Sequence, residues 1–510
     1  MNYIPYLILL ISYIIYKFVS NYQLNKFALK NGCKPIKKLP TPTFLSWLGL
    51  EFLYNAKKSI KEGLSNEKLY DTFQKLDTTT FETKIMFKKI IMTTEPENLR
   101  IMMAAANFYD WNIGYRPKAF GYLLGNSIFS SEGIVWKHSR ILLRPFFAKN
   151  HIKHITNMEP FIERVIKLIK QTQGEQIIDL QDLFQLFTID YSTFLLLGES
   201  CDTLKDRLGE STPETINKEY KQRFAWAFDT LAPILILKAM MGKFMFLYNP
   251  KEMNECIDIQ HKFVDYYIQK ALKMSNKELD EKSQDGTLFL YELAKQTKDP
   301  IVLRDNILSI ILAGRNTTSA LITFLFLELS RNQEIFEKLK HIIRKEFPNL
   351  NSITFESIQN CEYLRWCLNE TLRFHPSVPN ESKTSTKNQI LPKGGGKDNQ
   401  SPILIKKGQQ VLYPLWTANR NDKYFGPQSN IWNPERWSEL PKNGGIAFMP
   451  FSTGPRLCLG QQLALVEASY LTIRLLQTFN NLECHVGKEP LRKSNSATMR
   501  LLDGCNVIMS

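Results

Sequence analysis

The chain has 510 residues, of which 44% are hydrophobic and 12% aromatic, and this excludes a disordered chain, a disulfide-stapled mini-protein and a fibrous repeat. Its 65 Lys and Arg against 50 Asp and Glu give a formal net charge of +15. That balance indicates an acidic protein surface, an anionic membrane or a nucleic acid as partner. Six of the basic residues and no acid lie in the first fifty residues: Lys17, Lys26, Lys30, Lys34, Lys37 and Lys38.

The N-terminal segment is predicted to be a membrane anchor. Residues 1–16 carry no charged side chain. If Lys17 snorkels, the apolar run extends through Val19, close to the roughly 20 residues that a bilayer crossing needs. The lysines follow the run, which places the body of the protein in the cytosol. A shorter interfacial helix is the alternative, whereas a cleaved signal peptide fits less well because no A-x-A-like site follows.

The rest of the chain shows no second linker and no internal repeat. We expect a membrane anchor over 1–20, a basic, proline-containing linker over 21–50 and a single catalytic domain over 51–510. A strand is predicted over 83–93, followed by a helix that Thr94 caps, and a surface loop over 391–402. The fold class is mostly α with small β-sheets, because long helical patterns dominate: 158–172, 257–274, 302–332, 333–346, 361–374 and 459–478.

One of the eight cysteines has surroundings that indicate chemistry. No C-x-x-C pair is present, so a zinc ribbon or a disulfide framework is not expected. Cys458 stands at the start of an apolar helix, whose free N–H groups favour a thiolate. Gly460 lets a flat ligand approach the backbone, and Arg456 offers a cation to an acidic group. A thiolate beside one arginine and one aromatic residue suits a haem iron with propionates.

The segment around Cys458 resembles the signature F-x-x-G-x-R-x-C-x-G of the cytochrome P450 family, the haem-thiolate monooxygenases, and the resemblance covers essentially the whole chain. It implies the cytochrome P450 fold, haem b (iron protoporphyrin IX) as cofactor and O2 as co-substrate. Cys458 is then the axial ligand of the metal. The other cofactor-binding positions of the signature are Phe451, Gly454, Arg456 and Gly460.

Two further motifs of the family occur as charged pairs on predicted helices. Glu370 and Arg373 are three residues apart, and with Arg436 they resemble the family's buried structural cluster. Trp136 and Arg140 are four residues apart, and the resemblance implies that both reach a haem propionate. Each pair alone is equally typical of an ordinary helix surface.

The predicted helix over 302–332 carries Ala313-Gly314-Arg315-Asn316-Thr317-Thr318. Its small residues are expected to open a groove, and the resemblance makes Thr317 and Asn316 the catalytic positions. The family usually has an acid where Asn316 stands. An amide holds water but does not cycle a proton, so we expect poor coupling that Asn316→Asp improves. The departure keeps open a hydroperoxide-rearranging haem-thiolate isomerase or a haem-binding sensor.

Several stretches resemble the alkane- and fatty-acid-hydroxylating cytochromes P450 of alkane-assimilating yeasts. The most telling is Leu391-Pro392-Lys393 followed by three glycines, Gly394 to Gly396. The implied reaction is hydroxylation of a terminal or near-terminal carbon of an n-alkane or a long-chain fatty acid. Candidate pocket residues are Phe120, Leu312, Ala313 and Val378. For a substrate carboxylate we expect a cation, and Arg116 is one of several candidates. Asn419 and Arg420 depart from the family's usual His-Arg, with only a local effect expected.

The electrons are expected to come from another protein, because no dinucleotide- or flavin-binding segment is evident in this chain. The resemblance implies NADPH-cytochrome P450 reductase as the partner, on an endoplasmic reticulum bilayer that also delivers the hydrophobic long-chain substrate. A stretch with five cations and no acid is the predicted docking face. It contains Lys137, Arg140, Arg144, Lys149 and Lys153. Nucleic-acid binding is not expected, since no recognition motif accompanies the charge.

Overall fold

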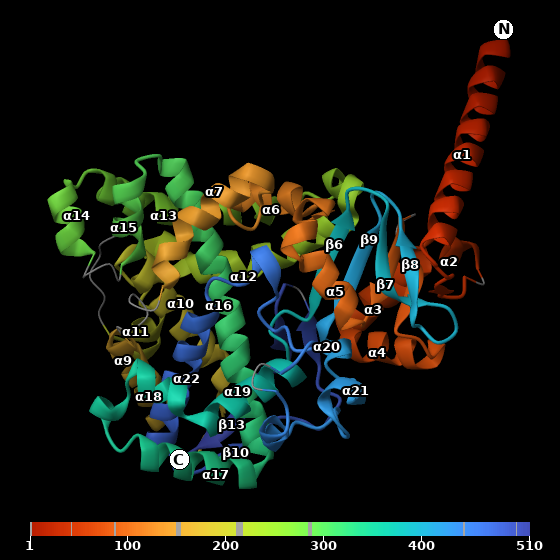
Figure 1. Cartoon of the computed structure of the whole chain (residues 1–510). Coiled ribbons are helices and arrows are strands. Elements are labelled where there is room, and N and C mark those ends of the chain that lie inside the picture. Colours follow the sequence, from red (N-terminus) through yellow and green to blue (C-terminus); the bar gives the residue numbers. More distant parts are fainter. Residues whose placement is uncertain are drawn as a thin grey trace. The chain divides into compact units, whose positions relative to one another are not determined.

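The computed structural model describes residues 3–41, 43–85, 88–148, 155–210, 218–283, 288–441, 444–495 and 497–510 (Figure 1). It confirms the predicted class, because helices make up most of the chain and the four sheets are small. The chain forms two compact units. The first comprises Met1–Ala56, Glu67–Asn112 and Glu381–Pro414, and the second Lys57–Asn66, Ile113–Asn380 and Leu415–Ser510.

The first unit begins with the long helix α1, Ile4–Lys30, in which no residue is buried. Pro5 stands in its first turn, where a missing N–H costs nothing. Among the described residues, three helical stretches are long and apolar enough to cross a membrane: α1, Arg223–Leu247 and Pro300–Arg331. The other two are partly buried in the protein, so α1 is the helix that fits the predicted anchor. It continues ten residues beyond the expected boundary at residue 20.

The main sheet of the first unit has six strands in the order β1-β2-β3-β9-β6-β4. The strand predicted over 83–93 is instead parts of two strands, because β2 and β3 pair antiparallel with Ile85 opposite Lys88. Thr94 is not the helix cap, since Glu95 holds that position and Pro96 begins α5. The strands are β1 Lys37–Lys38, β2 Thr80–Ile85, β3 Lys88–Thr93, β4 Trp111–Asn112, β6 Asn380–Ser385 and β9 Gln410–Pro414. The helices are α2 Phe44–Leu48, α3 Leu50–Glu62, α4 Ser65–Leu76, α5 Pro96–Met103 and η1 Ala105–Asp110.

The predicted loop over 391–402 is also wrong, because most of it forms a second hairpin, β7 (Gln389–Gly395) with β8 (Ser401–Ile405). The glycines of this hairpin allow neighbouring residues to approach its backbone closely. A Cβ at Gly394, whose φ is +110°, would lie 2.4 Å from the Thr80 hydroxyl. A Cβ at Gly395 would lie 2.7 Å from the Pro402 carbonyl oxygen. Glycine is therefore required inside a strand at a β-bulge.

The second unit is helical, and α16 (Pro300–Arg331) runs through it in contact with α10, α13, α19 and α22 (Figure 1). Asp299 caps α16 by accepting from the Ile301 N–H at 2.8 Å, and Pro300 follows as the first helical residue. All six helices predicted from periodicity are present, with ends shifted by at most six residues. Most of α16 is buried, so it forms the spine of the unit.

The remaining elements of this unit surround α16. The helices before it are α6 Arg116–Leu124, α7 Gly133–Leu143, η2 Arg144–Phe147, η3 Ile155–Met158, α9 Glu159–Lys170, α10 Leu180–Leu197, α11 Thr203–Leu208, α12 Lys218–Met241, η4 Gly242–Leu247, α13 Lys251–Leu272, α14 Asn276–Lys282 and α15 Phe289–Gln296. Those after it are α17 Gln333–Glu346, η5 Leu350–Ser352, α18 Phe355–Asn360, α19 Glu362–Phe374, α20 Leu415–Ala418, α21 Asp422–Phe425, η6 Pro434–Ser438, η7 Gly454–Arg456 and α22 Gln461–Thr478. The short strands are β5 Ile178–Asp179, β10 Leu482–Cys484, β11 Lys493–Asn495, β12 Met499–Leu501 and β13 Asn506–Met509.

Candidate active site

A tight loop before α22 presents Cys458. The loop is closed by the Cys458 N–H, which donates to the Phe451 carbonyl oxygen at 3.0 Å. Two residues in it, Ser452 and Gly454, adopt positive φ angles of 62° and 70°. All eight cysteines fall within the described residues, and Cys458 is the one that is exposed. The loop therefore singles out the same cysteine as the sequence motif.

The pKa of the Cys458 thiol is shifted in the direction opposite to the prediction. Burial raises its pKa, while the hydrogen bond from the Gly460 backbone and the charge of Arg140 act in the opposite direction. The sulfur is thus accessible but closely surrounded by protein, and desolvation outweighs the helix start that the sequence emphasised. Gly460 leaves room beside the sulfur, since a Cβ there would lie 4.0 Å from Sγ and 3.7 Å from Phe147.

Two arginines and one tryptophan gather next to this loop. Trp136 on α7 is buried, with the Arg456 guanidinium 4.7 Å and the Arg140 guanidinium 5.7 Å from its ring centre. Arg140 donates to the Leu457 carbonyl oxygen at 3.0 Å, and Arg456 donates to that of Ser131 at 3.1 Å. The motif on α7 and the cysteine motif, more than 300 residues apart, thus form one cluster.

The cluster has an excess of positive charge. Burial and the nearby cations Arg116 and Arg140, opposed by Glu132, together lower the pKa of Arg456 to about 10. Three guanidiniums around one acid form a site for an anion. The sequence offered Arg116 only as one possible partner for a substrate carboxylate. No pattern in the neighbouring sequence indicates that Arg116 belongs to this cluster, because its position depends on how α6 and α7 pack against the cysteine loop.

One stretch of α16 is less buried than the rest. Leu312, Ala313, Gly314, Asn316 and Thr317 are half-buried within a helix that is otherwise largely inaccessible. The Thr317 hydroxyl donates to the Ala313 carbonyl oxygen at 2.6 Å, which leaves its oxygen free to accept another hydrogen bond. A Cβ at Gly314 would lie 3.7 Å from the Ser192 hydroxyl of α10, an ordinary van der Waals distance. The packing of α10 on α16 therefore does not itself require a glycine at this position.

The four candidate pocket residues do not all have the same surroundings. Phe120 and Leu312 are half-buried and pack against the main hydrophobic cluster of the helical unit. Val378 is 36% exposed. Its neighbour Ser377 donates to the Thr317 carbonyl oxygen at 3.0 Å, and the Ser377 carbonyl oxygen accepts from the Met499 N–H at 2.9 Å. Ser377 is a residue that the sequence did not single out, and it ties the Val378 segment to α16 and to β12.

The predicted charge cluster is assembled around Glu370, which is fully buried. Its carboxylate accepts from Arg373 Nε and Nη2 at 2.8 Å, from Arg436 Nε at 2.9 Å and from Trp437 Nε1 at 3.0 Å. The Asn433 N–H adds a further bond at 2.8 Å. Burial alone raises the carboxyl pKa, but Arg373, Arg436 and these hydrogen bonds together hold the pKa of Glu370 below its usual range.

Two interactions of α16 carried no signal in the sequence. Arg315 forms a bidentate ion pair with Asp229 of α12, at 2.7 and 3.1 Å. Glu467 of α22 is buried, and although a hydrogen bond from Thr318 opposes it, burial raises the pKa of Glu467 to about 8. Both pairs join residues that are about 90 to 150 positions apart, so no motif marks them.

The chemical groups that these residues offer match those that a haem requires. An accessible thiol lies beside a glycine that leaves space, the arginine cluster would hold two carboxylates, and the half-buried stretch of α16 offers small and polar groups. Among the described residues, no cluster of three or more His, Cys, Asp or Glu forms an alternative metal site. Within the described part of the chain, Cys458 is thus the exposed thiol that this arrangement offers to a metal.

Comparison with known proteins agrees with this geometry. The family model for cytochrome P450 matches residues 40–503. The chain is 49% identical over 502 residues to cytochrome P450 52C2 of Candida maltosa, covering 98% of both chains. It is 45% identical over 494 residues to cytochrome P450 52C1 of Candida tropicalis, covering 97% of both. It is 42% identical over 459 residues to cytochrome P450 52A12 of Debaryomyces hansenii, covering 89% of this chain and 88% of the other. The chain therefore belongs to the cytochrome P450 family and is a haem-thiolate monooxygenase.

Proposed function

We propose that this monooxygenase hydroxylates the terminal or near-terminal carbon of n-alkanes or long-chain fatty acids, using O2, haem b and electrons from NADPH-cytochrome P450 reductase. The observation that carries the proposal is the similarity to cytochromes P450 52C2 and 52C1 over nearly their whole length. The mostly apolar lining offered by Phe120, Leu312, Ala313 and Val378 suits a hydrocarbon chain. Because such a chain has few polar groups, recognition rests on shape and on exclusion of water.

The chain's own residues have distinct roles in this proposal. Cys458 ligates the metal, and Arg140, Arg456 and Trp136 hold the acidic groups of the cofactor, with Phe451, Gly454 and Gly460 shaping the loop. When bound, haem supplies the redox chemistry that activates O2. Thr317 orients the oxygen by its hydroxyl, and Asn316 holds a water molecule nearby. Glu370, Arg373 and Arg436 keep the loop that contains η6 fixed to α19.

A reductase would bind at the basic face of α7. Lys137 and Arg144 are exposed there, whereas Arg140 is engaged with the Leu457 carbonyl oxygen. Lys149 and Lys153, which the sequence also assigned to this face, lie outside the described residues. The anchor α1 would hold the enzyme in the endoplasmic reticulum membrane with its catalytic domain in the cytosol, where an acidic reductase domain has access to the exposed cations.

The test is turnover by purified enzyme with reductase and NADPH, with products identified by mass spectrometry. Dodecane and laurate should each be offered, and a terminal or subterminal alcohol is expected. Cys458→Ser should abolish the product and the absorption band of the carbon monoxide complex that is typical of thiolate ligation. Products from fatty-acid hydroperoxides without NADPH would instead identify an isomerase. Ligand binding without any product would identify a sensor, and either result would refute the proposal.

A further inference from the structure

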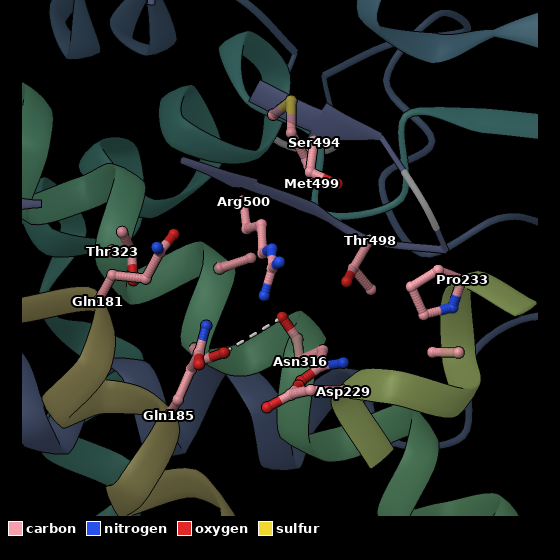
Figure 2. A pocket seen from close by; sticks show the side chains of 13 residues that line it. Gln181, Gln185, Asp229, Pro233, Asn316, Thr323, Ser494, Thr498, Met499 and Arg500 are labelled. Carbon is pink, nitrogen blue, oxygen red and sulfur yellow. Dashed lines mark hydrogen bonds between the residues drawn. The ribbon is translucent and has the colours of Figure 1, made fainter. Parts of the chain in front are cut away.

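A small polar cavity lies behind the stretch of α16 that carries Asn316 (Figure 2). Its volume is about 40 Å³. Polar side chains from α10, α12, α16 and the β11–β12 hairpin point into it, and Ala232, Pro233, Ala320 and Met499 complete the lining. The lining residues whose polar groups matter for the argument are Gln185, Asp229, Asn316, Ser319, Thr323 and Arg500.

The α16 residues that line the cavity are Asn316, Ser319, Ala320 and Thr323. Their spacing of three, four and seven residues places them on one helix face. Thr317 follows Asn316 by one residue and therefore lies on the adjacent face, the one that includes Ala313. The cavity and the proposed oxygen site are thus on neighbouring sides of the same helical turn, with Asn316 at the boundary.

The cavity is built to hold a polar molecule. The Thr323 side chain is fully buried, and its hydroxyl has no hydrogen-bond partner within the part of the chain that the structure describes. A buried hydroxyl without a partner is costly, so a ligand in the cavity is expected to satisfy it. A volume of this size admits about one water molecule with two to four polar partners and excludes a fatty-acid carboxylate with its chain.

Asp229 connects this cavity to solvent. Its side chain is 38% exposed, while that of its partner Arg315 is 4% exposed, so the ion pair runs from the surface into the protein. The pair is bidentate, which holds the carboxylate in a fixed orientation at the cavity. A carboxylate that both lines a cavity and reaches solvent is placed to exchange protons with water on either side.

We propose that the cavity holds one ordered water and that Asp229 relays protons through it, in place of the acid that Asn316 does not supply. The inference rests on the proposed function, in which each hydroxylation consumes O2, two electrons and two protons and releases one water. In each transfer the cavity water gives a proton toward Thr317 past Asn316. The water regains a proton from the Asp229 carboxyl, and Asp229 takes its proton from bulk solvent.

The variant Asp229→Asn tests the relay. It keeps a hydrogen bond to Arg315 but removes the exchangeable proton. At saturating substrate and reductase, the hydroxylation rate should fall at least tenfold and the solvent deuterium isotope effect should rise. The matched control is Asp265→Asn. Asp265 also pairs with an arginine of α16, Arg304, at 3.1 Å, and has a similar exposure of 36%, but it does not line the cavity.

Two further measurements distinguish a relay from a structural role. The substrate-induced change in the haem absorption spectrum should be unchanged in Asp229→Asn, although loss of the counter-charge of the buried Arg315 lowers the thermal midpoint. Asn316→Asp in the same chain should restore most of the rate without restoring that midpoint. A crystal structure of the haem-loaded enzyme should show a water within hydrogen-bond distance of Thr323 Oγ1. The inference is overturned by equal rates in Asp229→Asn and Asp265→Asn, by failure of the rescue, or by an empty cavity. Absence of any alcohol from the unmutated enzyme would instead refute the proposed function.

Discussion

The charge cluster around Glu370 permits a quantitative test of what a buried ion pair contributes to this fold. In Glu370→Gln, Arg373 loses its counter-charge, and its side chain is fully buried and also donates to carbonyl oxygens of Asn419, Ser429 and Ile431. Breaking a buried pair by removing one partner costs about 3–5 kcal/mol. Arg436 would also lose its bond to the carboxylate. We therefore expect a loss of free energy of unfolding in the upper part of that range.

The same helix supplies a matched control. Glu362 and Arg365 of α19 have the same three-residue spacing and pair at 3.1 Å, but their side chains are 59% and 44% exposed. An exposed pair contributes about 0.2–1 kcal/mol, so Glu362→Gln should change stability little. The assay is urea unfolding of each variant followed by tryptophan fluorescence. A midpoint shift in Glu370→Gln no larger than that in Glu362→Gln would refute the reasoning from burial.

Three further predictions follow from contacts and conformations in the structure. The native pKa of Glu467 is about 8, well above the value near 4.3 of an unfolded glutamate. At a pH between these two values, the native state therefore binds one more proton than the unfolded state. Stability should therefore fall as pH rises through this window, and Glu467→Gln should flatten that slope in urea titrations at successive pH values. Gly394→Ala should lower the urea midpoint more than Gly408→Ala: both have positive φ, but only the first Cβ meets another residue, at 2.4 Å from Thr80. In the Asp229→Asn background, where the proposed relay is lost, Asn316→Asp should raise the alcohol formed per NADPH consumed, and an unchanged ratio there would show that the amide does not limit proton delivery.

The sequence predicted best those features that depend on neighbouring residues. The extent of α16 was predicted from helical periodicity, and the structure begins the helix at Pro300, after the capping Asp299 and two residues before the predicted position. The loop that presents Cys458 follows from a motif of ten adjacent residues. In both cases the information needed lies within a few turns of chain, where spacing determines which groups meet.

Features that depend on tertiary packing were not predicted. The pKa direction of Cys458 was wrong because desolvation depends on the atoms that surround the thiol, which no local pattern reveals. The glycines at 394 and 395 read as a loop, since a sequence does not show that Thr80 and Pro402 approach them. The pairing of Asp229 with Arg315 joins two helices, and neither residue lies in a motif that names the other.

Ser377 gives the enzyme a constraint on how it can change over generations. One residue bonds the Thr317 carbonyl oxygen through its hydroxyl and the Met499 N–H through its carbonyl oxygen. A substitution in the β11–β12 hairpin that displaced Met499 would therefore also shift the backbone beside Thr317. The hairpin and this turn of α16 are thus constrained to change together, and a variant altered in one should need a compensating change near Ser377.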